Sequence, residues 1–241
     1  MWTKRCLILT IVIIAIFCAG CSDKVNEEAI SWNEKGNEYH SYGLDEEAIE
    51  AYEKATEFEP KYAGAWYNLG KVHFEHSDYQ EALMAFDNVI ELEPKNIDAW
   101  YYKSLSLANI GENQGSIQSL EGAIVALDKT IELDSQNATF WDTKAWVFTE
   151  LGRYEEAIEA YDKATELNPQ DKEAWGSKSN LLYMLGRYEE ALQAFDKFIE
   201  LDPSNPQPWS SKGRVLEKLG RHDEAQVCFD KAKELSDLLW K

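Results

Sequence analysis

Six tryptophans recur at a nearly constant interval, and this constrains the fold more than any other feature of the sequence. They are Trp32, Trp66, Trp100, Trp141, Trp175 and Trp209, with spacings of 34, 34, 41, 34 and 34 residues. Sequence self-similarity at a period of this length is typical of repeat architectures, in which each unit stacks only on its neighbours. We therefore expect six copies of one structural unit rather than a single globular core.

Within each copy the pattern indicates two amphipathic helices with a short break between them. A small residue follows each Trp by four positions, namely Gly36, Gly70, Ser104, Ala145, Ser179 and Gly213. The break is predicted at Gly43, Ser77, Gly111, Gly152, Gly186 and Gly220. Glycine adopts the left-handed conformation that ends a helix at low cost. A Pro near the end of four copies, such as Pro169, separates one copy from the next.

The order of Trp, small residue, Ala, aromatic residue and Pro resembles the tetratricopeptide repeat (TPR) family. The resemblance implies an all-α, right-handed superhelical solenoid of six helix-turn-helix repeats and about twelve helices. The repeats would span 29–62, 63–96, 97–137, 138–171, 172–205 and 206–239. Where the family has Leu, three residues after the Trp, five copies have Lys35, Lys103, Lys144, Lys178 and Lys212. We expect each lysine to pack its methylene stem on the core and to keep its ammonium in water.

The third copy is seven residues longer than the others, and the extra residues lie between Glu112 and Gly122. Apolar residues from Ile117 to Ile131 recur at helical spacing on one face. We therefore predict that the second helix of this repeat begins early and projects about 10 Å beyond its neighbours. Such a projection is either a tolerated surface insertion or a lateral docking ridge.

The sequence of the N-terminus predicts a targeting segment. Lys4 and Arg5 precede a short apolar run that ends in small residues, which predicts a signal peptide over 1–20. The Ala19-Gly20-Cys21 ending resembles the signal of prokaryotic lipoproteins and implies lipidation at Cys21, followed by a short tether over 21–28. An uncleaved signal anchor and free secretion are the alternatives.

Charge and motif content exclude several classes of function. The formal net charge is −20, which repels nucleic acid and anionic lipid. No phosphate-binding loop or nucleophile motif is present, so we expect no enzyme activity and no cofactor. His73 and His76 share a helix face, but we interpret them as packing and helix-end residues rather than metal ligands. Cys228 is expected to be a small buried residue, and Asn137 begins a candidate N-glycosylation motif.

The resemblance further implies that the first helix of each repeat lines a concave groove. Mapped onto this chain, the candidate peptide-binding residues are Asn37, Tyr67, Lys71, Phe74, Tyr101, Trp146, Asn180, Tyr183 and Arg214. Fixed aromatic rings and amides suit contact with a peptide. We therefore predict a scaffold that is lipid-anchored on the extracytoplasmic face of a cell membrane and binds envelope or membrane proteins. The alternatives are a structural component that pairs as a homodimer through its C-terminal end, and an assembly factor for a surface apparatus.

The C-terminus allows two structures, because stacked repeats need a polar outer face at their end. The last helix can run on through Leu238, Leu239 and Trp240 and cover part of its own end. Otherwise the uncovered end pairs with another copy of the chain.

Overall fold

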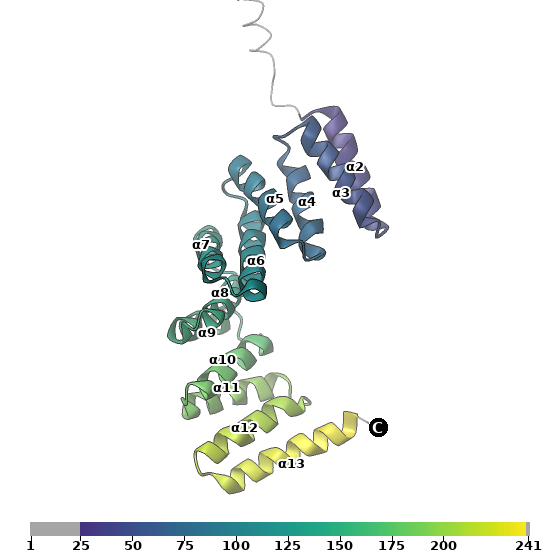
Figure 1. The fold of residues 1–241 in the computed structure, drawn as a ribbon. Coiled ribbons are helices and arrows are strands. Elements are labelled where there is room, and N and C mark those ends of the chain that lie inside the picture. The colour runs from purple at the N-terminus through teal and green to yellow at the C-terminus, as the bar shows by residue number, and fades with distance from the viewer. Residues whose placement is uncertain (1–24, 240–241) are drawn as a thin grey trace, which may run out of the picture. The chain divides into compact units, whose positions relative to one another are not determined.

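The computed structural model describes residues 25–239, and every regular element in that range is an α-helix (Figure 1). This confirms the predicted all-α repeat fold and its twelve helices. The helices are α2 (Glu27–Ser41), α3 (Asp45–Phe58), α4 (Ala63–Glu75), α5 (Tyr79–Leu92), α6 (Ile97–Gln114), α7 (Ile117–Leu133), α8 (Ala138–Glu150), α9 (Tyr154–Leu167), α10 (Lys172–Met184), α11 (Tyr188–Leu201), α12 (Pro206–Lys218) and α13 (His222–Leu239). Among the described residues, none of these helices has the length and apolarity needed to cross a bilayer.

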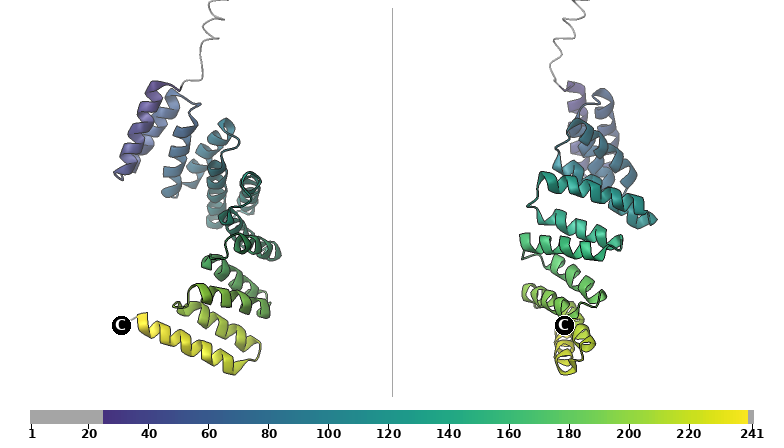
Figure 2. Two further views of the ribbon diagram at one scale, coloured as in Figure 1. Left: turned by 180° about the vertical axis from the view of Figure 1, so that it is seen from behind. Right: turned by 90° about the vertical axis from the view of Figure 1, so that its left-hand side faces the viewer.

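The chain divides into two compact units, one ending at Pro94 and the other beginning at Lys95. In each unit the even-numbered helix of a repeat packs along the odd-numbered helix that follows it (Figure 2). We call these helix A and helix B of the repeat. Helix B then packs against helix A of the next repeat, as α3 does on α4 in the first unit and α9 does on α10 in the second.

The turns between helices A and B depend on residues with a left-handed backbone. Gly43, Gly152, Gly186 and Gly220 have φ between 71° and 75°. Ser77 takes the same conformation with φ 65°, without being a glycine. This confirms the turn positions predicted for five of the six repeats.

Close approach of the two helices requires the small residue of each repeat. A Cβ added to Gly70 would lie 2.9 Å from Cζ of Phe86, whose ring is completely buried. A Cβ on Gly36 would lie 2.5 Å from the buried ring of Tyr52. Glycine at these positions therefore allows an aromatic ring of helix B to pack against the backbone of helix A.

The turn position predicted for the third repeat was wrong. The turn glycine is Gly115, with φ 64°, whereas Gly111 is buried inside α6. The insertion lengthens α6 to 18 residues and α7 to 17, against 13 and 14 for α8 and α9. Glycine is needed at position 111 because a side chain there would meet Leu120, whose Cγ lies 2.5 Å from the Cβ position. Both helices are extended, so the early start expected for helix B accounts for only part of the insertion.

The two ends of the array carry polar residues at positions that are apolar in other repeats. Ser31 and Glu38 of α2 are exposed, whereas Ala65 and Val72, which lie 34 residues later in α4, are buried. At the other end, Gln226 of α13 is exposed, whereas its counterpart in α11 is a buried Leu. Stacked repeats need such polar terminal faces to remain soluble.

The last helix extends beyond the length of an ordinary helix B. α13 has 18 residues, against 14 in α11, and runs to Leu239. The expected extension of the last helix through Leu238 is therefore present, as far as Leu239. Leu238 remains 58% exposed, so its side chain contributes little cover. Trp240 lies outside the described residues.

Candidate functional site

The candidate groove residues lie on A helices of both units. Asn37, Tyr67, Lys71 and Phe74 belong to α2 and α4 of the first unit. Tyr101, Trp146, Asn180, Tyr183 and Arg214 belong to α6, α8, α10 and α12 of the second unit.

In the first unit the amides of α2 and α4 form a hydrogen-bonded network. Asn68 Nδ2 donates to Asn33 Oδ1 at 2.9 Å and to Asn37 Oδ1 at 3.1 Å. Tyr52 donates its hydroxyl hydrogen to Asn37 Oδ1 at 2.9 Å, and Asn33 Nδ2 donates to the Tyr62 hydroxyl at 3.2 Å. Burial and nearby acids raise the pKa of Tyr52 to about 12, so its hydroxyl keeps the proton that it donates. The network fixes the side chain of Asn37 while leaving it exposed.

The aromatic residues on α4 are held by rings of the neighbouring helix. Tyr67 meets Phe86 edge-on, with ring centroids 6.0 Å apart, and Phe74 meets Tyr79 at 5.5 Å. Both Tyr67 and Phe74 are half-buried, as is Lys71. These side chains present part of their surface to solvent in a fixed orientation. Because they are already ordered, less side-chain conformational entropy is lost when a partner binds.

In the second unit, Tyr101 links α6 to α8. Its ring lies 4.9 Å from that of Phe140, and its hydroxyl is 3.1 Å from Thr143 Oγ1. Trp146 and Tyr183 are half-buried against the core, and Tyr183 lies 6.0 Å from Tyr188. Tyr101 thus serves to hold two A helices together, while Trp146 and Tyr183 present partly open ring surfaces.

Two of the polar candidates have exposed side chains. The side chain of Asn180 on α10 is exposed and makes no hydrogen bond to another described residue. Arg214 on α12 is also exposed, and its guanidinium donates to Ser211 Oγ at 2.9 Å. A polar side chain without a partner on the same face as half-buried aromatics can donate to a peptide backbone.

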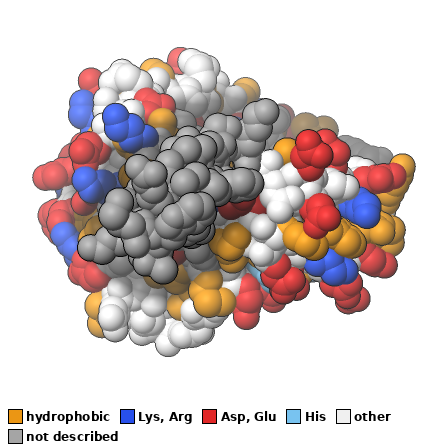
Figure 3. Space-filling view, turned by 90° about the horizontal axis from the view of Figure 1, so that it is seen from above, with side chains coloured by type: hydrophobic (Ala, Val, Ile, Leu, Met, Phe, Trp, Pro, Cys, Tyr) orange, Lys and Arg blue, Asp and Glu red, His pale blue; other side chains and the backbone are white. Residues whose placement is uncertain are grey.

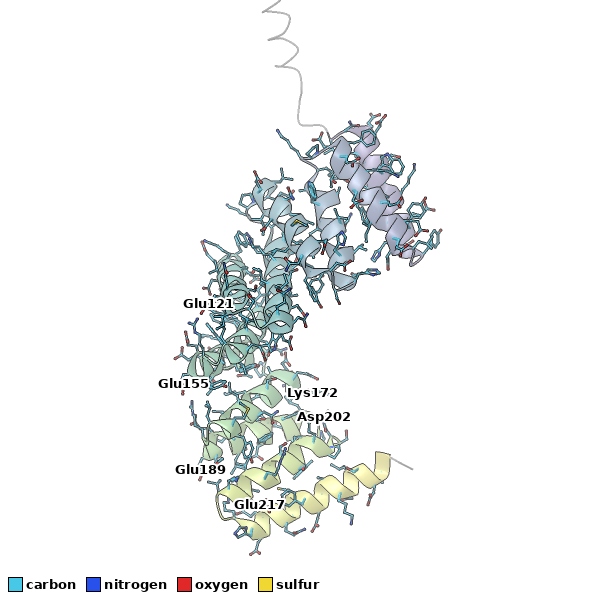
Figure 4. The ribbon with its side chains drawn as sticks, in the orientation of Figure 1. Glu121, Glu155, Lys172, Glu189, Asp202 and Glu217 are labelled. Atoms are coloured by element: carbon cyan, nitrogen blue, oxygen red, sulfur yellow. The ribbon has the colours of Figure 1, made fainter. Side chains whose placement is uncertain are left out.

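Asp142 on α8 has an environment that the sequence does not reveal. It is half-buried, and within the described residues it has no ion pair. Burial, followed by the charges of Asp171 and Glu173, raises its pKa to about 6. Lys172, which could neutralise this region, instead binds Asp202 with Nζ and Oδ2 2.8 Å apart, and Figure 4 shows the two side chains together. The acids around Asp142 are therefore not neutralised by Lys172.

The histidines of the first unit contact carboxylates. His40 Nδ1 and His76 Nε2 each lie 2.8 Å from a different oxygen of Asp45. The hydrogen bond to Asp45 raises the pKa of His76, and hydrogen bonds from His40 and then His76 lower the pKa of Asp45. His73 lies apart from this cluster, 3.5 Å from Asp78. Between residues 25 and 239 no group of three potential ligands is arranged to hold a metal ion.

A ladder of ion pairs between consecutive repeats was missed at the sequence level. Lys144 Nζ lies 2.6 Å from Asp128 and Lys178 Nζ lies 2.6 Å from Asp162, each joining helix A to the preceding helix B. Both lysine side chains are only 16% exposed, and the Lys178 ammonium lies 4.9 Å from the centre of the Trp175 ring. The stems pack on the core as expected, but the ammonium groups bind aspartate rather than water. An Asp sixteen residues before the Lys is the signal that would have identified the ladder.

Acidic residues also line one edge of the second unit. Figure 4 shows Glu121, Glu155 and Glu189 near the N-terminal ends of their helices on that edge. Arg153 spans two repeats there, with Nη1 3.2 Å from Glu121 and a second ion pair to Glu156. In the surface view of Figure 3, acidic side chains are prominent among the charged groups drawn in colour.

The remaining candidate residues have local structural roles or lie outside the described range. Asn137 caps α8 by accepting a hydrogen bond from the backbone N–H of Thr139 at 3.0 Å. Cys228 is 5% exposed, and burial raises the pKa of its thiol, which agrees with the expected packing role. Cys21 and the rest of 1–24 lie outside the described residues.

Four family models match the chain, and all describe this repeat. They are a tetratricopeptide repeat over 143–206, a TPR repeat over 36–77, the TPR domain of cytochrome c-type biogenesis protein H over 59–173, and a tetratricopeptide repeat over 194–227. Together they span 36–227 without a gap. The chain therefore belongs to the tetratricopeptide repeat family, a class of protein-interaction scaffolds.

Solved structures with the same fold include several of MamA. One MamA crystal structure has 23% identity and a TM-score of 0.66, covering 73% of this chain and 92% of the other. MamA from Desulfovibrio magneticus RS-1 has 22% identity and a TM-score of 0.68, with 75% and 98% covered. YrrB, described as a TPR protein with an unusual peptide-binding site, has 22% identity and a TM-score of 0.64, with 78% and 93% covered. No curated protein matches the sequence.

Proposed function

We propose that this protein is a membrane-anchored scaffold that binds a peptide or helix of another envelope protein on its A-helix faces. The observation that carries the proposal is the combination, on these faces, of half-buried aromatic rings with exposed polar groups such as Asn37 and Asn180. Binding sites commonly combine fixed aromatic anchors with a few polar groups that set orientation. YrrB, which shares the fold, supports this reading because its description includes a peptide-binding site.

The A-helix surface can be tested at Asn180, because its side chain is exposed and free of contacts that the fold needs. Asn180→Arg should block the face without unfolding the chain. Partners crosslinked to the full chain in solubilised membranes should then be lost from the pull-down. Gln193→Arg is the matched control, since Gln193 is an exposed amide on helix B of the same repeat. Equal capture by both variants would show that the partner binds elsewhere.

Membrane anchoring rests on the sequence of the N-terminus. The basic residues, the short apolar run and Ala19-Gly20-Cys21 support cleavage before Cys21 and lipidation of that residue. Because α2 begins at Glu27, the residues left for a tether are 22–26, which could extend at most about 18 Å and would hold the repeats next to the bilayer. Cys21→Ser should shift the protein from the detergent phase to the aqueous phase or leave it unprocessed. An unmodified Cys21 in mass spectrometry of the mature N-terminus would refute the anchor.

A second candidate function is the assembly of envelope proteins. One specific observation favours it. The model that matches 59–173 describes a TPR domain of a cytochrome c-type biogenesis protein. Under this proposal the scaffold would hold a c-type cytochrome, or another component of a surface apparatus, during its assembly. Deleting the gene should reduce haem-stained c-type cytochromes in membranes, and the Asn180→Arg variant should fail to restore them. Unchanged cytochromes in the deletion strain would exclude this role.

A further inference from the structure

A hydrogen-bonded cluster of titratable side chains joins the first repeat to the second. His40 lies in the last turn of α2, Asp45 is the first residue of α3, and His76 directly follows α4. The two oxygens of Asp45 lie 2.8 Å from His40 Nδ1 and 2.8 Å from His76 Nε2. His40 Nε2 lies 3.5 Å from Glu75 Oε2. One carboxylate therefore contacts an imidazole from each repeat, and we call these four residues the histidine cluster.

The cluster occupies positions that are aromatic or apolar at a later junction of the array. Between the fifth and sixth repeats, the positions of the two histidines and the aspartate hold Tyr183, Tyr188 and Leu219. The rings of Tyr183 and Tyr188 lie 6.0 Å apart, and Tyr188 and Leu219 line the same small cavity. All three pack against the hydrophobic core of the second unit. The junction before it has Thr149, Tyr154 and Leu185 at these positions, and none of these side chains titrates near neutral pH.

The first junction therefore depends on contacts whose charge can change. Histidine is the side chain that gains or loses its charge between about pH 5 and 8. A protonated imidazole and a carboxylate form a charge-assisted hydrogen bond, which is about twice as strong as a neutral one. A neutral imidazole can still donate one hydrogen bond, but it no longer attracts the carboxylate as a cation does.

The groups that face the cluster from the neighbouring helices supply no other cation. Glu75 and Asp78 act on His76 from α4 and from the turn after it. Tyr52 of α3 has a pKa raised to about 12 by burial and by nearby acids, so it stays neutral. His73 of α4 lies 3.5 Å from Asp78 and does not contact Asp45. Within the described residues, no lysine or arginine forms an ion pair with Asp45 or Glu75.

The first unit is also strongly acidic, which makes the loss of these protons costly. From residue 25 to Pro94 the chain has 17 Asp and Glu residues but only four Lys and no Arg. When the histidines of the cluster are neutral, the carboxylates around them repel one another without a nearby cation.

We propose that the histidine cluster is a pH-sensitive clamp, which holds the first repeat on the second while its histidines are protonated and loosens when they are neutral. The hydrogen bond to Asp45 raises the pKa of His76, so its attraction is complete below pH 6.5 and is lost as the pH rises through the folded pKa. Hydrogen bonds from His40 and then His76 lower the pKa of Asp45, so the acceptor remains charged at pH 3.8 and above. The clamp is therefore closed in mildly acidic solution and loosens as the pH rises through and above neutrality.

The amide network on the same two repeats does not share this dependence. Asn33, Asn37 and Asn68 join α2 to α4 through side chains that do not titrate. The histidine cluster therefore supplies the pH-dependent part of the junction, at the end of the repeats where helix A turns into helix B.

The test is hydrogen–deuterium exchange of the full chain in mild detergent, measured by mass spectrometry at pH 5.5 and 8. Exchange is corrected for the intrinsic rate at each pH, so that it reports local opening of each helix pair. We expect the protection of α2 and α3, relative to that of α10 and α11, to fall about threefold or more as the pH rises, the size expected for partly exposed ion pairs.

The double variant His40→Gln/His76→Gln keeps side chains that can donate hydrogen bonds but cannot become charged. Its α2 and α3 should show the low protection of the wild type at pH 8 at both pH values. His222→Gln is the matched control, because His222 is exposed and occupies the position of Asp45 in the sixth repeat. It should leave the wild-type difference between the two pH values unchanged.

A third variant rebuilds the first junction with the residues of the later one. His40→Tyr/Asp45→Tyr/His76→Leu should hold the first repeat equally well at both pH values. The proposal is overturned if the relative protection of wild-type α2 and α3 is the same at pH 5.5 and 8. It is equally overturned if the wild-type difference persists in the double glutamine variant, which decides the matter even where the triple variant does not fold.

Discussion

Replacing Asp142 by Asn should stabilise the protein, because the carboxylate at this position is held in an unfavourable environment. Its pKa rises from 3.8 to about 6, chiefly through burial and then through repulsion by Asp171 and Glu173. One pKa unit corresponds to about 1.4 kcal/mol, so the full shift corresponds to about 3 kcal/mol. The side chain keeps part of its contact with water, and solvent screening reduces the expected gain at pH 7 to roughly 1–2 kcal/mol.

The sign of the pH dependence distinguishes this cause from a general packing effect. Asp142 has a higher pKa in the folded state than in the unfolded chain. Its contribution to stability is therefore fully present below pH 3.8 and is lost as the pH rises through about 6. The difference between wild type and Asp142→Asn should accordingly be near zero below pH 3.8 and reach its full value above about pH 6. Comparing the two proteins removes the contributions of other carboxylates, which both share.

The measurement is urea unfolding of the full chain in detergent, followed by circular dichroism between pH 3.5 and 8. Carbon-detected NMR of the Asp142 carboxyl group provides a direct titration with an expected midpoint near pH 6. Glu173→Gln is the matched control, because it removes a neighbouring charge from an exposed position and should give a smaller gain. A stability difference that is the same at every pH, or a variant less stable than wild type at pH 7, would refute the reasoning.

Three further predictions concern the packing, the histidine cluster and the C-terminal end. Gly70→Ala should destabilise the fold by about 1–3 kcal/mol in urea unfolding, because the new methyl group overlaps the buried ring of Phe86, and an unchanged stability would contradict this packing. The hydrogen bond to Asp45 raises the pKa of His76. The contribution of His76 to folding stability is therefore present below its unfolded pKa of 6.5 and is lost as the pH rises through its folded pKa. His76→Gln should therefore flatten the melting temperature measured between pH 6 and 8, and an unaltered slope would assign the dependence to other groups. Deleting 238–241 should leave a monomer with a lower melting temperature in light scattering and calorimetry, whereas a dimer that dissociates would favour pairing of C-terminal ends.

The turn of the third repeat shows why regular spacing did not predict the boundaries of every helix. Gly111 lies eleven residues after its Trp, as do the turn glycines of other repeats such as Gly152. Position alone therefore predicted a break at Gly111. The helix continues to Gln114, and Gly115 supplies the left-handed residue that ends it. Dividing the insertion between two helices depends on how Leu120 packs on Gly111, which local sequence does not specify.

The candidate site was likewise only partly predictable from the sequence. Helical period places Trp146, Asn180 and Tyr183 on A helices, and the structure finds them there. The same period does not show that the Tyr101 hydroxyl contacts Thr143, because that contact joins residues 42 positions apart. Whether a candidate residue is free to bind a partner is thus decided by neighbours in space.

The sequence by itself determines the repeat class of this protein, since one helix pair cannot bury its apolar face and the 34-residue period supplies neighbours that can. It also determines most of the turns, because left-handed backbone conformations favour glycine at positions such as Gly186. Only the tertiary structure decides which charges are neutralised. Lys178 forms an ion pair with Asp162, whereas Asp142 lies near other acids and Arg214 donates a hydrogen bond to a neutral hydroxyl group. The reason is that ion pairing and the desolvation of charged groups depend on distances between different helices, and those distances cannot be derived from a net charge or a local motif.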